Sequence, residues 1–277
     1  MAVLTGFAVP IAGVQADHTY VTSNDGFVWP CWGRSTGGQL ITAGNGSSAL
    51  ANCLSQSDSR AGLIYAITGV CHQTANRILF PAGALVSEAR GYGLSVAIYG
   101  TYGTDRLAWP ARIAACVNAT GGGGGVHAYQ DENLQEQAYR RRVLALYAAR
   151  GSDDLSGIVE GHVYTSVEIR THLRGELALL AEWRLGRRDF AEALYGHQQI
   201  AVLEKTRMDS ALLGGQLSGE RYSTQVNELA AELVSATARE IGPLETARLY
   251  DQSPGQPTVL VETEIAVEVY DRPKYRM

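Results

Sequence analysis

A run of five glycines, Gly121–Gly125, is the feature that most constrains how this chain can fold. Consecutive glycines cannot sit inside regular structure without a large entropic cost. Residues 1–120 contain all four cysteines, three of the four tryptophans and 11 charged residues with a net charge of +1. Residues 126–277 contain 40 charged residues with a net charge of -6. The glycine run therefore predicts a boundary between two parts of different character.

Several protein classes are excluded by composition. The chain has no run approaching the roughly 18 apolar residues that a membrane helix needs. A net charge of -5 with only two lysines argues against nucleic acid or an anionic membrane as the main partner. Four cysteines without a C-x-x-C pair are too few for a disulfide scaffold and do not form a zinc knuckle.

Sequence patterns predict an α+β fold. Short segments of the first part (IAGV, HTYV, FVWPCW and LSVAIYGTY), each bounded by turn signals, are typical of strands, and one helix is expected over 71–79. In the second part, apolar residues recur every 3.6 positions over 134–147, 169–180, 190–201 and 222–233, which predicts helices.

The segment Thr258 to Tyr270 (TVLVETEIAVEVY) alternates between apolar residues and glutamates, as a half-buried strand does. We expect it to return to the sheet of the first part, or to that of a neighbouring subunit. The predicted organisation is a β-rich domain over 1–120 with one nucleophile helix, a helical domain over 126–250, and a final strand within 256–277.

The N-terminal residues Ala2 to Ala16 are apolar and end in a small-x-small triplet, which is one feature of a cleaved signal. They lack a positive n-region and contain Pro10, so a buried first strand and a cytoplasmic protein are expected.

Cys71 is the strongest candidate for chemistry. It follows an apolar stretch ending in Thr68-Gly69 and begins the predicted helix, where unpaired N–H groups and the helix dipole stabilise a thiolate. A thiolate nucleophile also needs a base. His18 lies on an extended segment from which its ring could reach the thiol, whereas His72, adjacent to Cys71 on the helix, points about 100° away.

A strand histidine followed in the chain by a cysteine at a helix start resembles the circularly permuted branch of the papain-like superfamily, which includes NlpC/P60-type and lecithin:retinol-acyltransferase-like proteins. The resemblance covers residues 1–120 and rests on order and context. The segment GVCHQTANRIL matches none of the family signatures letter for letter. The resemblance implies a papain-like domain with a Cys71 nucleophile and a His18 base. Gln39, Asn52 and Asp17 are alternatives for the third, orienting residue, and the spacing does not select among them.

Metal and nucleotide sites are weaker alternatives. Cys31, Cys53, Cys71 and His72 lack the paired spacing of a zinc site, and Glu168 with His172 does not make a di-metal bundle. The glycine run has no Lys-Ser/Thr after it, so no P-loop is present. We therefore expect neither a metal nor a cofactor.

The leading hypothesis is a cysteine-dependent hydrolase or acyl/amide transferase, such as a peptidase, amidase or deamidase, acting on a peptide, amide or acyl substrate. The alternative is a non-enzymatic assembly protein in which the helical half docks partner subunits or further copies of the chain. A Cys71 sulfur more than roughly 6 Å from both His18 ring nitrogens would favour the alternative.

Overall fold

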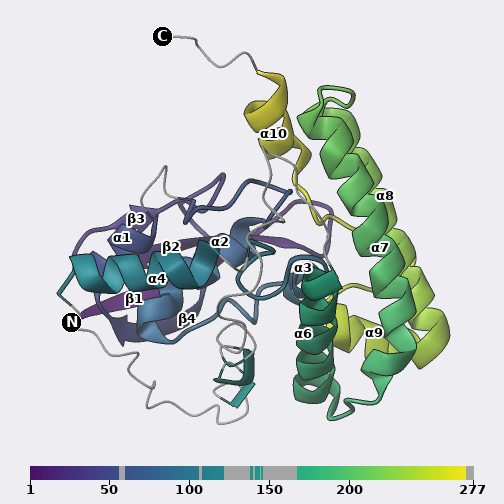
Figure 1. The fold of residues 1–277 in the computed structure, drawn as a ribbon, viewed down its shortest axis with the longest axis horizontal. Coiled ribbons are helices and arrows are strands. Elements are labelled where there is room, and N and C mark those ends of the chain that lie inside the picture. The colour runs from purple at the N-terminus through teal and green to yellow at the C-terminus, as the bar shows by residue number, and fades with distance from the viewer. Residues whose placement is uncertain are drawn as a thin grey trace.

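The computed structural model describes residues 1–55, 60–105, 108–121 and 167–272, together with 138–139, 141–143 and 145 between them. In these residues an antiparallel sheet at the N-terminus is followed by helices, so the fold is α+β as predicted (Figure 1). No helix within the described ranges has the length and apolar character needed to cross a membrane.

The sheet is built from the first 46 residues. Its strands lie in the order β3-β2-β1-β4 and all neighbours are antiparallel; they are β1 (Ala2–Pro10), β2 (Asp17–Ser23), β3 (Val28–Trp29) and β4 (Gln39–Gly46). Strand β1 pairs on both sides and buries every second residue. The expected buried N-terminal strand is therefore confirmed, as is the strand predicted at HTYV.

The first part contains more helix than the sequence predicted. Its elements after the sheet are α1 (Ser48–Ser55), α2 (Cys71–Leu79), the 3-10 turn η1 (Phe80–Ala82), α3 (Tyr92–Tyr99) and α4 (Ala108–Ala119). Helix α2 has the predicted bounds. The strand predicted at LSVAIYGTY is wrong, because that segment forms α3. Every residue of α3 is buried, and a short run that is apolar on all sides carries no periodicity to separate helix from strand.

Two other predicted strands also differ from the structure. Residues 11–14 (IAGV) form a turn between β1 and β2, and FVWPCW contributes only the two residues of β3. The positive φ angles of Cys31 and Trp32, 51° and 71°, are incompatible with extended strand and end the pairing there.

The helices of the second part confirm three of the four predicted segments. They are α6 (Val167–Leu185), α7 (Phe190–Leu213), α8 (Gly219–Ile241) and α9 (Pro243–Tyr250). Helix α8 ends at Gly242, and Pro243 begins α9. The fourth segment, 134–147, lies mostly outside the described residues, as does most of the glycine run.

The predicted C-terminal strand is wrong. After an extended stretch, the chain forms a short helix α10 (Thr263–Ala266) that continues into a π-helical turn, η3 (Val267–Asp271). A spacing of four residues separates Val261, Ile265 and Val269. This spacing fits one face of a helix as well as one face of a strand. The segment does not join the sheet of the first part as predicted, and it contacts that part at His18 and Tyr65 instead.

Both parts contribute to one continuous core. In Figure 1 the sheet with α1, α2 and α4 occupies one side of the molecule and α6 to α9 the other. Helix α3 lies between them and packs against α6, α7 and α9. The buried Gln198 amide of α7 donates hydrogen bonds to the carbonyls of Ala97 and Leu173. The two parts of the chain are therefore packed together as one body.

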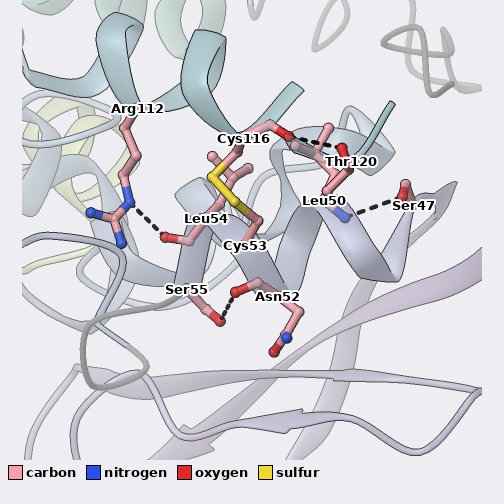
Figure 2. Close-up of a disulfide and its surroundings, with 9 residues drawn as sticks. All are labelled: Ser47, Leu50, Asn52, Cys53, Leu54, Ser55, Arg112, Cys116 and Thr120. Atoms are coloured by element: carbon pink, nitrogen blue, oxygen red, sulfur yellow. Dashed lines mark hydrogen bonds between the residues drawn. A yellow bond between two sulfur atoms is a disulfide. The ribbon is translucent and has the colours of Figure 1, made fainter. Parts of the chain in front are cut away.

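A disulfide joins Cys53 of α1 to Cys116 of α4 (Figure 2). The same two helices are also held by a hydrogen bond from Arg112 Nε to the Leu54 carbonyl, 2.8 Å long. The sequence predicted no role for either cysteine. The pairing corrects that expectation, because the helix contact brings together two thiols that are 63 residues apart in the chain.

We predict that alkylation of the unfolded, unreduced chain labels only Cys31 and Cys71, and that all four cysteines are labelled after reduction. Replacing both Cys53 and Cys116 with serine should lower the free energy of unfolding by about 4 kcal/mol, because the closed loop restricts the unfolded chain. Intact-mass counting of labels and urea denaturation measure the two effects. Four labels without reductant would contradict the pairing.

Candidate active site

Cys71 is the first residue of α2, and the helix start is fixed by its own side chains. Val70 is the N-cap residue, and its N–H donates to the Gln73 side chain at 3.1 Å. The first intrahelical bond runs from Thr74 N–H to the Val70 carbonyl. The Cys71 amide therefore belongs to the N–H groups that the helix leaves unpaired, at the positive end of its dipole.

Strand β2 is attached to this helix start through the Asp17 carbonyl. His72 Nε2–H donates to it at 3.1 Å, and Cys71 Sγ lies 4.0 Å from the same oxygen. Burial lowers the pKa of His72 to about 4, so its ring is neutral and serves as a structural link. Because Asp17 is bound in this way, the next residue along the strand, His18, lies beside the thiol.

Three side chains meet at this point. Cys71 Sγ, a His18 ring nitrogen and a Glu262 carboxylate oxygen all lie within 4.8 Å of one another. His18 Nδ1 forms a hydrogen bond with Glu262 Oε1 at 3.1 Å. His18 and Cys71 are only 3% and 5% exposed, whereas the Glu262 side chain is 24% exposed. The sulfur-to-nitrogen distance is below the 6 Å limit that would have favoured a non-enzymatic protein.

The surroundings of His18 favour its protonated form. Burial by itself opposes the charge on the ring, but hydrogen bonding and charge interactions with Cys71 and Glu262 outweigh burial and raise the pKa of His18 to about 10. His18 Nε2 is buried without a hydrogen-bond partner among the described residues. The ring is thus an imidazolium at neutral pH, held between the Cys71 sulfur and the Glu262 carboxylate.

Glu262 is positioned by the helical half. Asn227 of α8 accepts hydrogen bonds from the N–H groups of Leu260 and Val261 and donates one to the Val261 carbonyl, at 2.8 to 2.9 Å. The N–H of Glu262 itself donates to the Tyr65 hydroxyl at 2.8 Å. One amide side chain and one phenol therefore fix the backbone that carries the carboxylate.

The loop that leads into Cys71 is also held from the helical half. Ala66 has a φ of 59°, and its carbonyl accepts hydrogen bonds from the hydroxyls of Tyr99 and Tyr222. The buried Lys205 ammonium donates to the Ile67 carbonyl at 3.2 Å and to both oxygens of Asp209 at 2.8 Å. These contacts hold in place a backbone conformation that is costly for alanine.

The loop after β3 forms a wall next to His18. Trp32 donates its Nε1–H to Thr74 of α2, and the Arg60 guanidinium lies 4.1 Å from the centre of its ring. Gly33 has a φ of 93°, and a Cβ there would lie 3.2 Å from His18 Cε1 and 3.0 Å from the Ile265 side chain. Only glycine allows this loop to approach the imidazole so closely.

The three predicted orienting residues do not contact the His18 ring in the part of the chain that the structure describes. The carboxylate of Asp17 pairs with Arg90 at 2.6 Å. Gln39 is exposed at the start of β4, and Asn52 lies on α1 beside the disulfide (Figure 2). Glu262 is the residue whose carboxylate contacts the His18 ring instead. Glu262 is one of the three glutamates of the alternating segment 258–270, and its local sequence carries no signal that distinguishes it from Glu264 or Glu268.

The alternative metal-ligand sets are not assembled. Cys53 is in the disulfide, and the His72 ring is bound to Ser95 and Asp17. Cys31 is a free, buried thiol that lies next to the Trp29 carbonyl, and burial raises its pKa well above the usual value. His172 pairs with Glu176, one turn further along α6.

Comparisons with known proteins return no match to this chain among family models, curated proteins or solved structures. The function is therefore inferred from the geometry of the site.

We predict that His18 makes stability depend on pH. Because its pKa is raised from 6.5 to about 10, its contribution is fully present below about pH 6.5 and is lost as the pH rises toward 10. The free energy of unfolding of the wild type should exceed that of His18→Gln most at pH 6, and the difference should shrink up to pH 10. Urea denaturation across this range measures it, and a constant difference would contradict the charged state of the ring.

We predict that Asn227→Ala makes the position of Glu262 less fixed and so lowers the pKa of His18. The same substitution should lower the free energy of unfolding by about 1–3 kcal/mol, because it leaves backbone groups of residues 260–261 without a partner. The pKa is measured by NMR titration of the imidazole. Glu228→Ala, at an exposed position next to it on α8, is the control and should leave the pKa unchanged. An unchanged His18 pKa in Asn227→Ala would show that Asn227 has only a general structural role.

Proposed function

We propose that the chain is a cysteine-dependent hydrolase or acyl/amide transferase. The observation that carries the proposal is the meeting of Cys71, His18 and Glu262 at the N-terminus of α2. A nucleophile, a base and a group that orients the base form the arrangement used in nucleophilic catalysis on unrelated folds. The resemblance to permuted papain-like enzymes also remains a proposal, and it supplies no counterpart for Glu262.

Each side chain has a role in the proposed reaction. The Cys71 thiolate attacks the carbonyl carbon of an amide, ester or thioester, and the N–H of Cys71 donates to the oxyanion that forms. The His18 imidazolium gives its proton to the leaving group, which departs and leaves a thioester on Cys71. Water or a second acceptor then attacks the thioester while His18 takes up the proton, and the thiolate is released.

Glu262 would hold the ring through Nδ1 and stabilise the imidazolium. Burial makes the positive charge of the ring unfavourable, because the ring loses contact with water. A carboxylate 3.1 Å away offsets this loss. The partial exposure of Glu262 leaves one side of the site open to solvent, from which a substrate could enter.

The substrate partner is proposed to be a peptide, amide or acyl compound. Docking of partner subunits by the helical half remains a prediction, and the exposed Ile200 and Leu203 on α7 are consistent with it. The cytoplasmic localisation also remains a prediction. The Cys53–Cys116 disulfide weighs against it, because structural disulfides persist mainly in oxidising compartments.

We expect p-nitrophenyl acetate to acetylate Cys71, with a burst of nitrophenol and a matching mass shift on the peptide that contains Cys71. His18→Gln should slow acetylation by about 10²-fold or more, and Cys71→Ser should abolish it. Glu262→Gln, which keeps the hydrogen bond but loses the charge, should cause a smaller loss.

Cys31→Ser is the matched control, because Cys31 is also free and buried but is not one of the three residues that meet at the site, and this variant should acetylate at the wild-type rate. Acetylation that is equally fast in His18→Gln and the wild type would overturn the proposal in favour of a non-enzymatic protein.

A further inference from the structure

We propose that the Cys71–His18–Glu262 cluster also binds one divalent zinc ion, which reversibly blocks the thiol. The cluster supplies one sulfur, one nitrogen and one oxygen ligand from three different parts of the chain. The binding rests on the geometry of the three side chains, whereas the inhibition rests on the proposed function.

The separations of the ligand atoms suit zinc. With zinc bonds of about 2.3 Å to sulfur and 2.0–2.2 Å to nitrogen and oxygen, tetrahedral ligands lie about 3.3–3.8 Å apart. His18 Nδ1 and Glu262 Oε1 are 3.1 Å apart, and no pair of ligand atoms in the cluster exceeds 4.8 Å. Movements of about 1 Å at the ends of the side chains therefore complete a three-ligand site.

The chemistry of the ligands selects the type of metal. A thiolate and an imidazole favour zinc over magnesium or calcium, which prefer sets made only of oxygen ligands. Three protein ligands leave the fourth position for water, as in zinc sites open to solvent. The exposed part of Glu262 provides the route of entry.

Among the described residues, the carboxylate of the cluster is not occupied by a fixed cationic side chain. In the described part of the chain, the ion-pair partner of Glu262 is His18, and no arginine or lysine pairs with this carboxylate. On binding, the proton that His18 Nδ1 shares with Glu262 is released to solvent, and the metal takes its place between the imidazole, the Cys71 thiolate and the carboxylate. The sulfur lone pair is then held by zinc and cannot attack a carbonyl.

The test is a zinc titration of the tag-free, unreduced full chain by calorimetry, with cobalt(II) as a spectroscopic probe. We expect one zinc ion per chain and a thiolate-to-cobalt charge-transfer band. Cys71→Ser, His18→Gln and Glu262→Gln should each weaken zinc binding at least about tenfold, and Cys71→Ser should also remove the band. Circular dichroism of each variant establishes that it is folded.

Two matched controls should bind zinc like the wild type. Cys31→Ser removes the other free thiol, and Glu264→Gln removes an exposed carboxylate two residues from Glu262. Saturating zinc should slow iodoacetamide alkylation of Cys71 at least tenfold, and a chelator should restore the rate.

The outcomes separate the two proposals. If zinc does not bind although acetylation of Cys71 depends on His18, the metal site is overturned and the proposed function stands. If zinc binds equally well to Cys71→Ser, the ion lies elsewhere and the metal site is again overturned. If zinc binds through the three residues but Cys71 never acetylates, the metal site stands and the proposed function fails.

Discussion

The buried ion pair between Lys205 and Asp209 is the interaction on which the site depends. Burial lowers the pKa of Lys205 and raises that of Asp209, which reflects the cost of removing both charges from water. Both charged groups also bind neighbouring polar groups. The Lys205 ammonium donates to the Ile67 carbonyl, and the Asp209 carboxylate accepts a hydrogen bond from the Tyr222 hydroxyl. The backbone carbonyls of the loop before Cys71 therefore have hydrogen-bond partners inside the core. These partners keep Ala66 in its positive-φ conformation.

The site is assembled from three segments that are far apart in the chain. Strand β2 brings His18, helix α2 brings Cys71, and the segment after α9 brings Glu262. Each is attached to its neighbour by hydrogen bonds to backbone groups: the Asp17 carbonyl joins β2 to α2, and the Tyr65 hydroxyl joins the loop before Cys71 to Glu262. Because Asn227 of α8 also holds the backbone just before Glu262, the helical half is an integral part of the site and not an appended domain.

Two of the errors in the predicted secondary structure, those at α3 and α10, have related causes. The segment of α3 is buried on all sides, so its sequence has no polar face from which a period could be read. The segment of α10 has apolar residues spaced by both two and four, so either period fits. Asn227 decides the second case, because its side chain accepts the N–H groups of Leu260 and Val261, which a strand would have given to a neighbouring strand, and Glu262 is then the N-cap residue of a helix.

Local sequence determined the features that depend on neighbouring residues: the start of α2 at Cys71, the extended segment carrying His18 and the long amphipathic helices. The tertiary structure decided which distant groups meet. The Cys53–Cys116 pair and the choice of Glu262 over Gln39, Asn52 and Asp17 follow from how α4 packs on α1 and how the chain returns past α8. A hydrogen bond between residues 244 positions apart leaves no local pattern, because the packing of the whole core sets its geometry.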